Sequence, residues 1–561
     1  MNGGQACVEV LRSAGVECVF GLLGGSMLEF YDALSQQDDI RYIGARDERA
    51  AGHMADAYAR LRNCPGVVLG AQAGPGVVNL VTAVAEAHLA YSPLVAIAGA
   101  VTRADQGNDT FQEVDQLSLF APICKRSIMV TDRARLAAAL EQAMHLAMSG
   151  RRGPVVLHVP RDLFSEQGPA PQPRNWQQAR PGQPAPAEMV RIVAALQAAR
   201  RPIIFAGGGF KPDGLDELQA LAEHLDLPVV CSTGHADLLT SDHPNNAGQT
   251  GARGNSLAAD LTRNADLILA LGARLAFNST FLNHEYVNSD ADIIQVDVEA
   301  SAVGRYYAVA VGVQAGAAQT SAALRASLSD GADTGDWDKW RSRFRDGVKQ
   351  LRAERDAEAK LDASPLHPQR VLAEMREVAT PDVLYTIDTG NACLQAADRL
   401  TYQALPGLVA PLDFGLVGFG YAAALGAAAA VPDRPVVCVM GDGGFGYTMA
   451  ELTTAVRYKM PVIAVVLDNA AWGAEKAYQQ TYFNGRTLGA DISTPPLDEF
   501  ARLCGADGYV VREPGEMAAA YGAALEKRTS AVIHVHVDPQ AIRPLRKDLF
   551  QRTERSSSKS T

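Results

Sequence analysis

The stretch that decides the fold is VVCVMGDGGFGYTMAELTTAVRYKMPVIAVVLDNAAWG, residues 436–473. It opens with the β-rich run VVCVM and closes with a second such run, VIAVVL, and the residues between them follow a helical pattern. Asp442 stands directly after the first run in a glycine-rich turn, which can approach a phosphate closely. Asp468 and Asn469 follow the second run. The pattern predicts a strand, a helix and a strand, with oxygen-bearing side chains at the carboxyl ends of adjacent strands.

The same alternation continues through the 561 residues, in runs such as GVVLG, LVAIAG, PIIFAG, DLILALG, DVLYTID and AVIHVHV. Unbroken β-branched runs separated by helical patterns are typical of parallel strands covered on both faces. Two segments interrupt the alternation: the Pro/Gln-rich GPAPQPRNWQQARPGQPAPAE and the charged, helix-like DWDKWRSRFRDGVKQLRAERDAEAK. We therefore predict an α/β protein with three doubly wound parallel-sheet domains, at residues 1–165, 186–330 and 365–545.

Composition narrows the class of partner. The net charge of −12 disfavours a nucleic-acid partner, because such proteins usually present a basic face. The eight cysteines include no C-x-x-C pair, and the amino terminus lacks the pattern of a signal peptide. The uncharged stretch 414–432 is mostly Gly and Ala, which favours a packed helix over a membrane span. We expect a cytoplasmic protein with neither a nucleic-acid nor a membrane partner.

The Gly-Asp-Gly turn, followed after a helix and a strand by an Asn, resembles the diphosphate-binding signature of thiamine diphosphate-dependent enzymes. The resemblance implies that Asp442, Asn469 and the carbonyl of Ala471 bind Mg²⁺, for which hard oxygen ligands are suited. The family usually has two Asn residues at the second strand end, whereas the first of the two is Asp468 here.

The predicted first domain contains a second motif that resembles these enzymes. In YIGARDERAAGHMADAYAR, residues 42–60, a strand turns into a helix at Glu48. The family has a glutamate at this place that bonds the aminopyrimidine ring of the cofactor, which implies that Glu48 is the catalytic residue. A buried carboxyl group there shifts the ring towards the form that accepts a proton.

Further motifs extend the resemblance over residues 1 to 540. They include GLLGG, the Gly-Pro-Gly turn in AQAGPGVVN, FQEVDQLSLF, TIDTGNAC and DFGLVGFG. In the family, the carbonyl of the residue at Gly415 accepts a hydrogen bond from the aminopyrimidine, and the side chain at Val417 bends the cofactor. The cofactor-binding residues implied by the resemblance are Gly25, Gly74, Gln112, Gly390, Asn391, Gly415, Val417, Gly441, Asp442, Gly443, Gly444, Asn469 and Ala471.

Within the family, the first block is similar to the acetolactate synthase branch, but two positions depart from acetolactate synthase itself. That group has an Arg where this chain has Asn278, and a Trp where it has Tyr478. Without the Arg, a charged partner for a second 2-oxoacid carboxylate is missing. NAAWGAEKAYQQTYFNGR and GARLAFNST instead resemble sulfoacetaldehyde acetyltransferases, which convert sulfoacetaldehyde and phosphate into acetyl phosphate and sulfite.

The resemblance thus implies an acyl-transferring enzyme that acts on a small aldehyde or 2-oxoacid, with phosphate as a further substrate. Arg274, Lys476 and Arg486 are candidate anion-binding groups, although ordinary surface charges would look the same. An acetolactate synthase-like decarboxylase or carboligase is the first alternative, and a non-catalytic oligomeric scaffold is the second. Because two subunits of such enzymes clasp one cofactor, the resemblance also implies a homodimer or homotetramer.

Overall fold

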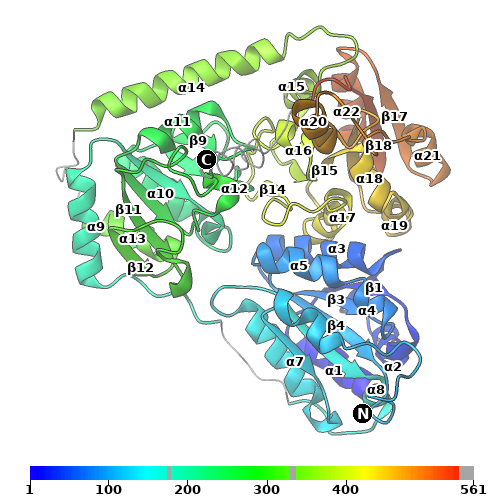
Figure 1. Ribbon diagram of the computed structural model, residues 1–561. Coiled ribbons are helices and arrows are strands. Elements are labelled where there is room, and N and C mark those ends of the chain that lie inside the picture. Colours follow the sequence, from blue (N-terminus) through cyan, green and yellow to red (C-terminus); the bar gives the residue numbers. More distant parts are fainter. Residues whose placement is uncertain (173–177, 329–335, 543–561) are drawn as a thin grey trace, which may run out of the picture. The chain divides into compact units, whose positions relative to one another are not determined.

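The computed structural model describes residues 1–172, 178–328 and 336–542. Part of the predicted Pro/Gln-rich connector, residues 173–177, lies outside this range, as do the last residues of the predicted second and third domains. Three parallel six-stranded sheets follow one another along the chain, each flanked by helices (Figure 1). The predicted fold class, α/β with three doubly wound parallel sheets, is confirmed.

The first sheet has the strand order β2 (Arg41–Gly44), β1 (Cys18–Leu22), β3 (Gly66–Gly70), β4 (Leu94–Ala100), β6 (Val155–Pro160) and β5 (Arg126–Met129). Its helices are α1 (Gly3–Ser13), α2 (Leu28–Ser35), α3 (Glu48–Arg62), α4 (Pro75–Val78), α5 (Val81–Leu89), α6 (Gln116–Phe120), α7 (Arg133–Met148) and α8 (Arg161–Ser165). Val67 and Leu69 of β3 share one apolar core with α1, α2, α7 and α8. The helices α3 and α5 lie on the opposite face (Figure 1). The strands are therefore buried on both sides, as their apolar sequences require.

The second sheet has the strand order β12 (Val311–Gln314), β11 (Asp292–Asp297), β10 (Leu267–Leu271), β7 (Pro202–Ala206), β8 (Val229–Cys231) and β9 (Asn246–Gln249). Its helices are α9 (Pro186–Ala198), α10 (Leu215–Leu225), α11 (Ser256–Asn264), α12 (Phe277–Thr280) and α13 (Ala317–Ser327), followed by α14 (Asp338–Glu358). Ile204 packs with α9, α10 and α13, whereas its neighbours Ile203 and Phe205 pack with α11 and α14. Successive residues of a strand point to opposite faces, so one apolar run supplies both cores.

The third sheet has the strand order β14 (Leu408–Val409), β13 (Leu384–Ile387), β15 (Val436–Gly441), β16 (Val462–Asp468), β18 (Ala531–His536) and β17 (Asp507–Val511). Its helices are α15 (Pro368–Val378), α16 (Asn391–Ala396), α17 (Gly420–Ala430), α18 (Asp442–Thr448), α19 (Leu452–Arg457), α20 (Gly473–Tyr482), α21 (Leu497–Leu503) and α22 (Glu516–Lys527). Short 3-10 turns lie at Gly25–Met27, Ala121–Ile123, Gly208–Phe210, Ala300–Ala302 and Met449–Glu451. The strand, helix and strand predicted from residues 436–473 are β15, α18 with α19, and β16.

The chain divides into two compact units. The first comprises residues 1–180 together with 421–436 and 448–462, and the second comprises the rest. The segments with most of α17 and all of α19 thus belong to the first unit although they lie in the last third of the sequence. Across the described residues, every helix is too short or too polar to cross a bilayer.

Candidate active site

Glu48 is held at the first turn of α3. The preceding Asp47 caps this helix by accepting a hydrogen bond from the Arg49 N–H at 2.8 Å. The Glu48 side chain is buried, and its Oε2 accepts a hydrogen bond from Asn79 Nδ2 at 3.0 Å. A Cβ atom on Gly76 would lie 2.8 Å from the other carboxyl oxygen, Oε1. Only glycine therefore leaves room for the Glu48 carboxyl group beside α4.

Three more predicted residues of the first unit lie around Gln72. The Gly25 N–H donates to Gln72 Oε1 at 2.8 Å, and Gln72 Nε2 donates to Gln112 Oε1 at 2.5 Å. Gly74 has a φ of +69°, and a Cβ atom there would lie 2.3 Å from the Gln112 carbonyl oxygen. Gly25, Gly74 and Gln112 thus form one contact network at the carboxyl edge of the first sheet, the edge where α/β proteins bind ligands.

A carboxylate from the last third of the sequence supports the turn that leads to Glu48. Glu451 is buried, and its Oε1 accepts a hydrogen bond from the Arg46 N–H at 2.8 Å. Its Oε2 accepts from Thr454 Oγ1 at 2.7 Å. Burial raises the pKa of Glu451. In the sequence, Glu451 is one residue of the helical pattern between the two β-rich runs, and no local pattern links it to a turn 405 positions earlier.

In the second unit, Asp442 begins α18 directly after β15. It is only 4% exposed, and its Oδ2 accepts a hydrogen bond from Thr494 Oγ1 at 3.2 Å. Burial and the neighbouring Asp468 carboxylate raise the pKa of Asp442 to about 7. A buried carboxylate beside a second one is a place where a bound cation offsets the electrostatic cost.

The unusual Asp468 has a dedicated partner. His534 Nε2 lies 2.7 Å from Asp468 Oδ2, and the Leu497 N–H donates to His534 Nδ1 at 3.2 Å. Because Nδ1 accepts, the ring proton stands on Nε2 and is donated to the carboxylate. Burial opposes ionisation of Asp468, but this hydrogen bond and the one from the Ala470 N–H outweigh it and lower its pKa. Neither His534 nor Thr494 was predicted, because His534 lies in a strand and Thr494 in a loop whose sequences match no functional motif.

The donor set fits a hard cation and a diphosphate. Asp442 supplies a carboxylate, Asn469 an amide oxygen that accepts from the Ala471 N–H at 3.2 Å, and Ala471 a backbone carbonyl. The glycine turn lies so close to its surroundings that side chains are excluded. A Cβ atom on Gly443 would be 2.6 Å from the Trp472 ring, and one on Gly444 would be 2.7 Å from Asp388 Oδ2.

Asp388 joins three glycine-containing loops and was missed by the sequence analysis. It is 1% exposed and accepts hydrogen bonds from the N–H groups of Thr389 at 2.7 Å and Gly418 at 2.9 Å. Burial raises its pKa to about 6. Gly390 and Gly415 both have positive φ values, +89° and +82°, which glycine adopts without strain.

Most predicted residues of the second unit line one cavity of about 390 Å³. Those that line it are Gly390, Asn391, Gly415, Val417, Gly441, Gly443, Gly444, Asn469 and Ala471. The cavity is also lined by residues that follow strands of the second sheet, among them Arg253 after β9 and Phe277 and Asn278 of α12. The Asn278 amide Nδ2 donates to the Leu412 carbonyl at 2.6 Å, so this side chain is engaged with the backbone.

Comparison with known families agrees with this architecture. Three family models match: "Thiamine pyrophosphate enzyme, N-terminal TPP binding domain" at residues 1–119, the central domain of the same enzymes at 189–324, and their C-terminal TPP binding domain at 388–535. Thiamine pyrophosphate is another name for thiamine diphosphate. The chain belongs to the thiamine pyrophosphate enzymes, in their acetolactate synthase-like branch, and is a thiamine diphosphate-dependent transferase or lyase.

Individual relatives cover almost the whole chain. A sulfoacetaldehyde acetyltransferase from Alcaligenes xylosoxydans xylosoxydans is 31% identical over 100% of this chain and 97% of that protein. A second one, from Castellaniella defragrans, is 32% identical over 99% of this chain and 96% of that protein. The acetolactate synthase isozyme 3 large subunit of Escherichia coli (strain K12) is 30% identical over 97% of both proteins.

Proposed function

We propose that this enzyme transfers an acetyl group from sulfoacetaldehyde to phosphate, giving acetyl phosphate and sulfite. The reaction is redox-neutral overall: the C–S bond breaks with sulfite as leaving group, the methylene carbon becomes a methyl group, and the aldehyde carbon forms a C–O bond to phosphate. Similarity over nearly the full length to two proteins named sulfoacetaldehyde acetyltransferase supports this proposal.

One observation of the site carries the choice of reaction. Acetolactate synthases have an Arg at the position of Asn278, and here the Asn278 amide donates to the Leu412 carbonyl. A neutral amide engaged in this way offers no charged, bidentate partner to the carboxylate of a second 2-oxoacid. The position therefore favours an acceptor other than a 2-oxoacid, and phosphate is such an acceptor.

We assign the roles of the side chains as follows. Asp442, Asn469 and the Ala471 carbonyl would hold Mg²⁺, and the glycine turns at Gly390 and Gly441 would let the backbone approach the diphosphate. When bound, thiamine diphosphate supplies a carbon nucleophile for attack on the carbonyl of the substrate.

Glu48 contributes a carboxyl oxygen that exchanges a hydrogen bond with the aminopyrimidine end of the cofactor. The contacts of its two oxygens support this role. Oε2 is anchored by Asn79, whereas Oε1 lies against Gly76, where only a glycine leaves room for it. The remaining predicted residues of the first unit, Gly25, Gly74 and Gln112, would line the same end of the cofactor.

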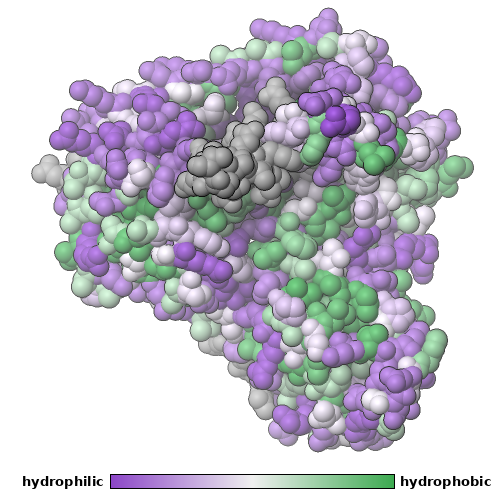
Figure 2. Space-filling model, in the orientation of Figure 1, coloured by the Kyte–Doolittle hydropathy of each residue, from purple (hydrophilic) through white to green (hydrophobic). Residues whose placement is uncertain are grey.

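We further propose a homodimer or homotetramer, in which residues 1–165 of one subunit and 365–545 of another bind one cofactor. Figure 2 shows apolar residues on the face of the first unit that carries α4 and α5. Val78 and Phe111 of this unit are exposed, Phe111 by 87%, and association would remove such side chains from water. The seven free cysteines of the described chain suit a reducing cytoplasm. Light scattering after size exclusion tests the oligomeric state.

The decisive experiment is a substrate test of the purified enzyme with thiamine diphosphate, Mg²⁺, phosphate and sulfoacetaldehyde. We expect sulfite and acetyl phosphate in equal amounts. The second candidate is a 2-oxoacid decarboxylase or carboligase, which the similarity to acetolactate synthases favours. Release of CO₂ from pyruvate, without sulfite from sulfoacetaldehyde, would replace the first proposal by the second.

A further inference from the structure

The cavity of the second unit contains one cationic side chain among its described lining residues, that of Arg253. The basic residues singled out from the sequence are engaged or placed elsewhere. Arg274 forms an ion pair with Asp413, and Lys476 Nζ lies 2.7 Å from Asp491. Arg486 is exposed and is not among the lining residues. The charge that faces the cavity is therefore one that the sequence motifs did not indicate.

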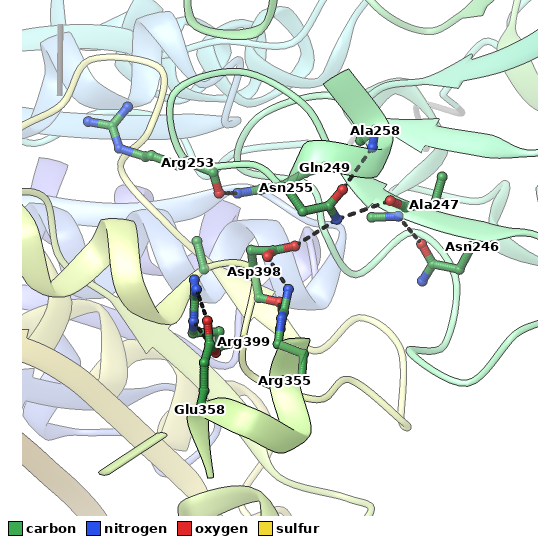
Figure 3. A network of polar contacts seen from close by, with 12 residues as sticks. Asn246, Ala247, Gln249, Arg253, Asn255, Ala258, Arg355, Glu358, Asp398 and Arg399 are labelled. Atoms are coloured by element: carbon green, nitrogen blue, oxygen red, sulfur yellow. Dashed lines mark hydrogen bonds and ion pairs between the residues drawn. The ribbon is translucent and has the colours of Figure 1, made fainter. Parts of the chain in front are cut away.

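The loop that carries Arg253 is held by contacts from both of its ends. The Arg253 carbonyl accepts a hydrogen bond from Gln249 Nε2 at 2.5 Å, and Gln249 is fully buried. Asn255 Nδ2 donates to Asp398 Oδ1 at 3.0 Å, and Asp398 also pairs with Arg355 of α14 (Figure 3). A Cβ atom on Gly251 would lie 2.1 Å from the Asn278 carbonyl oxygen, so the loop packs tightly there as well.

The guanidinium group itself takes no part in this network. Figure 3 shows it directed away from Asn255 and Asp398. Its Nε is buried without a hydrogen-bond partner, and the described chain offers Arg253 no ion pair. Two acidic residues, Glu475 and Asp538, line the same cavity but do not pair with it in the described structure. A guanidinium carried by a loop that is held in this way, with no anionic partner among the described residues, is suited to an external anion.

We propose that Arg253 binds an oxyanion in this cavity, either the acid group of the substrate or the phosphate acceptor. The inference rests on the proposed function, because it places the ligand in the cavity that the predicted cofactor-binding residues line. If Arg253 binds the acid group, the substrates are restricted to small carbonyl compounds that carry such a group. If it binds phosphate, the residue explains why phosphate is the acceptor. Planar guanidinium donors pair with sulfonate, carboxylate and phosphate oxygens alike.

The test compares Arg253→Gln and Arg253→Lys with the wild type and with Arg352→Gln, a matched change at an exposed position of α14. Isethionate, an unreactive sulfonate, and inorganic phosphate are titrated separately into each holoenzyme by calorimetry. For at least one of the two anions, we expect Arg253→Gln to raise the dissociation constant about 10- to 100-fold, as loss of a charge-assisted contact should. Arg253→Lys should restore part of the affinity, and Arg352→Gln should bind as the wild type does.

Weakened isethionate binding identifies the acid group of the substrate as the ligand, and weakened phosphate binding identifies the acceptor. The inference is overturned if Arg253→Gln keeps the wild-type melting temperature and binds both anions as well as the wild type, or if the wild type binds neither. Failure of the proposed function looks different. In that case sulfite is not released, yet anion binding still depends on Arg253. Unchanged KM values in Arg253→Gln with normal sulfite release would instead reject only the role of Arg253.

Discussion

His534 Nε2 lies 2.7 Å from Asp468 Oδ2, although the two residues are 66 positions apart in the chain. The pair lies directly beside Asn469 at the end of β16, and Asp468 in turn raises the pKa of Asp442. The backbone N–H of Leu497 determines which ring nitrogen carries the proton, so His534 acts as a donor to the carboxylate. An aspartate at a position where the family usually has asparagine is thus accommodated by a histidine that donates a hydrogen bond to its carboxylate.

Replacing His534 by alanine should weaken Mg²⁺ binding about 10- to 100-fold, because residues that orient metal ligands contribute at this level. Asp468 would lose its donor and would repel Asp442 more strongly. The affinity can be read from the quenching of protein fluorescence as Mg²⁺ is added with thiamine diphosphate. The double variant Asp468→Asn, His534→Ala removes the unpaired charge and should recover affinity. Equal affinities of His534→Ala and wild type would disprove this role.

Glu48→Gln should lower turnover about 10²- to 10⁴-fold, the usual contribution of a positioned acid–base group. The amide keeps the size of the side chain and a hydrogen-bonding oxygen for Asn79, so the fold and the affinity for cofactor and Mg²⁺ should change little. Glu377→Gln, at an exposed position of α15, serves as the control. Steady-state rates measure the effect on turnover, and cofactor titration measures the effect on the affinity for cofactor and Mg²⁺. Wild-type turnover of Glu48→Gln would show that another group moves the proton.

Gly74→Ala should destabilise the first unit more than Gly107→Ala does. Both glycines have positive φ values, +69° and +79°, so both substitutions introduce backbone strain of about 1–2 kcal/mol. Only at Gly74 does the new Cβ atom also meet the Gln112 carbonyl oxygen, whereas at Gly107 no described heavy atom lies within 4 Å. Urea unfolding midpoints of the two variants measure the difference. Identical midpoints would mean that the loop around Gln112 moves aside for the new Cβ atom at no cost in stability.

Acidification should reduce the stability of the first unit through His158. This residue is fully buried between Gln116 and Ser127, with Gln116 Nε2 3.1 Å from Nδ1 and Ser127 Oγ 2.9 Å from Nε2. Burial lowers its pKa from 6.5 to about 4, although Asp115 acts in the opposite direction. The unfolded chain therefore binds the proton first as the pH falls below 6.5.

The resulting loss in the free energy of unfolding between pH 6.5 and 4 is up to about 3 kcal/mol. His158→Gln should show a shallower decline over the same window when unfolding by urea is followed at several pH values. Part of the decline in unfolding free energy with falling pH should persist in His158→Gln, because burial also lowers the pKa of His53 to about 3. If the free energy of unfolding depends on pH in the same way in wild type and variant, His158 does not contribute to the loss of stability.

The local sequence determined the architecture. Runs of β-branched residues between helical patterns specify parallel strands with two buried faces, because periodicity and burial are read over a few neighbouring residues. The same local patterns placed Glu48, Asp442 and Asn469 after strands, and in the structure they follow β2, β15 and β16, with Glu48 and Asp442 as the first residues of α3 and α18. Glycine positions such as Gly74 and Gly390 could also be anticipated, since a motif records where the backbone needs positive φ.

Tertiary structure alone decided which charges meet. Glu451 reaches the turn before Glu48, His534 donates a hydrogen bond to Asp468, and Asp413 forms an ion pair with Arg274 across 139 positions. No periodicity encodes these pairs, because they depend on how loops from distant elements come together. For the same reason Arg253 could not be told apart from Arg274, Lys476 and Arg486 in the sequence. That its charge has no partner among the described residues is a property of the cavity and its neighbours, which exist only in the folded chain.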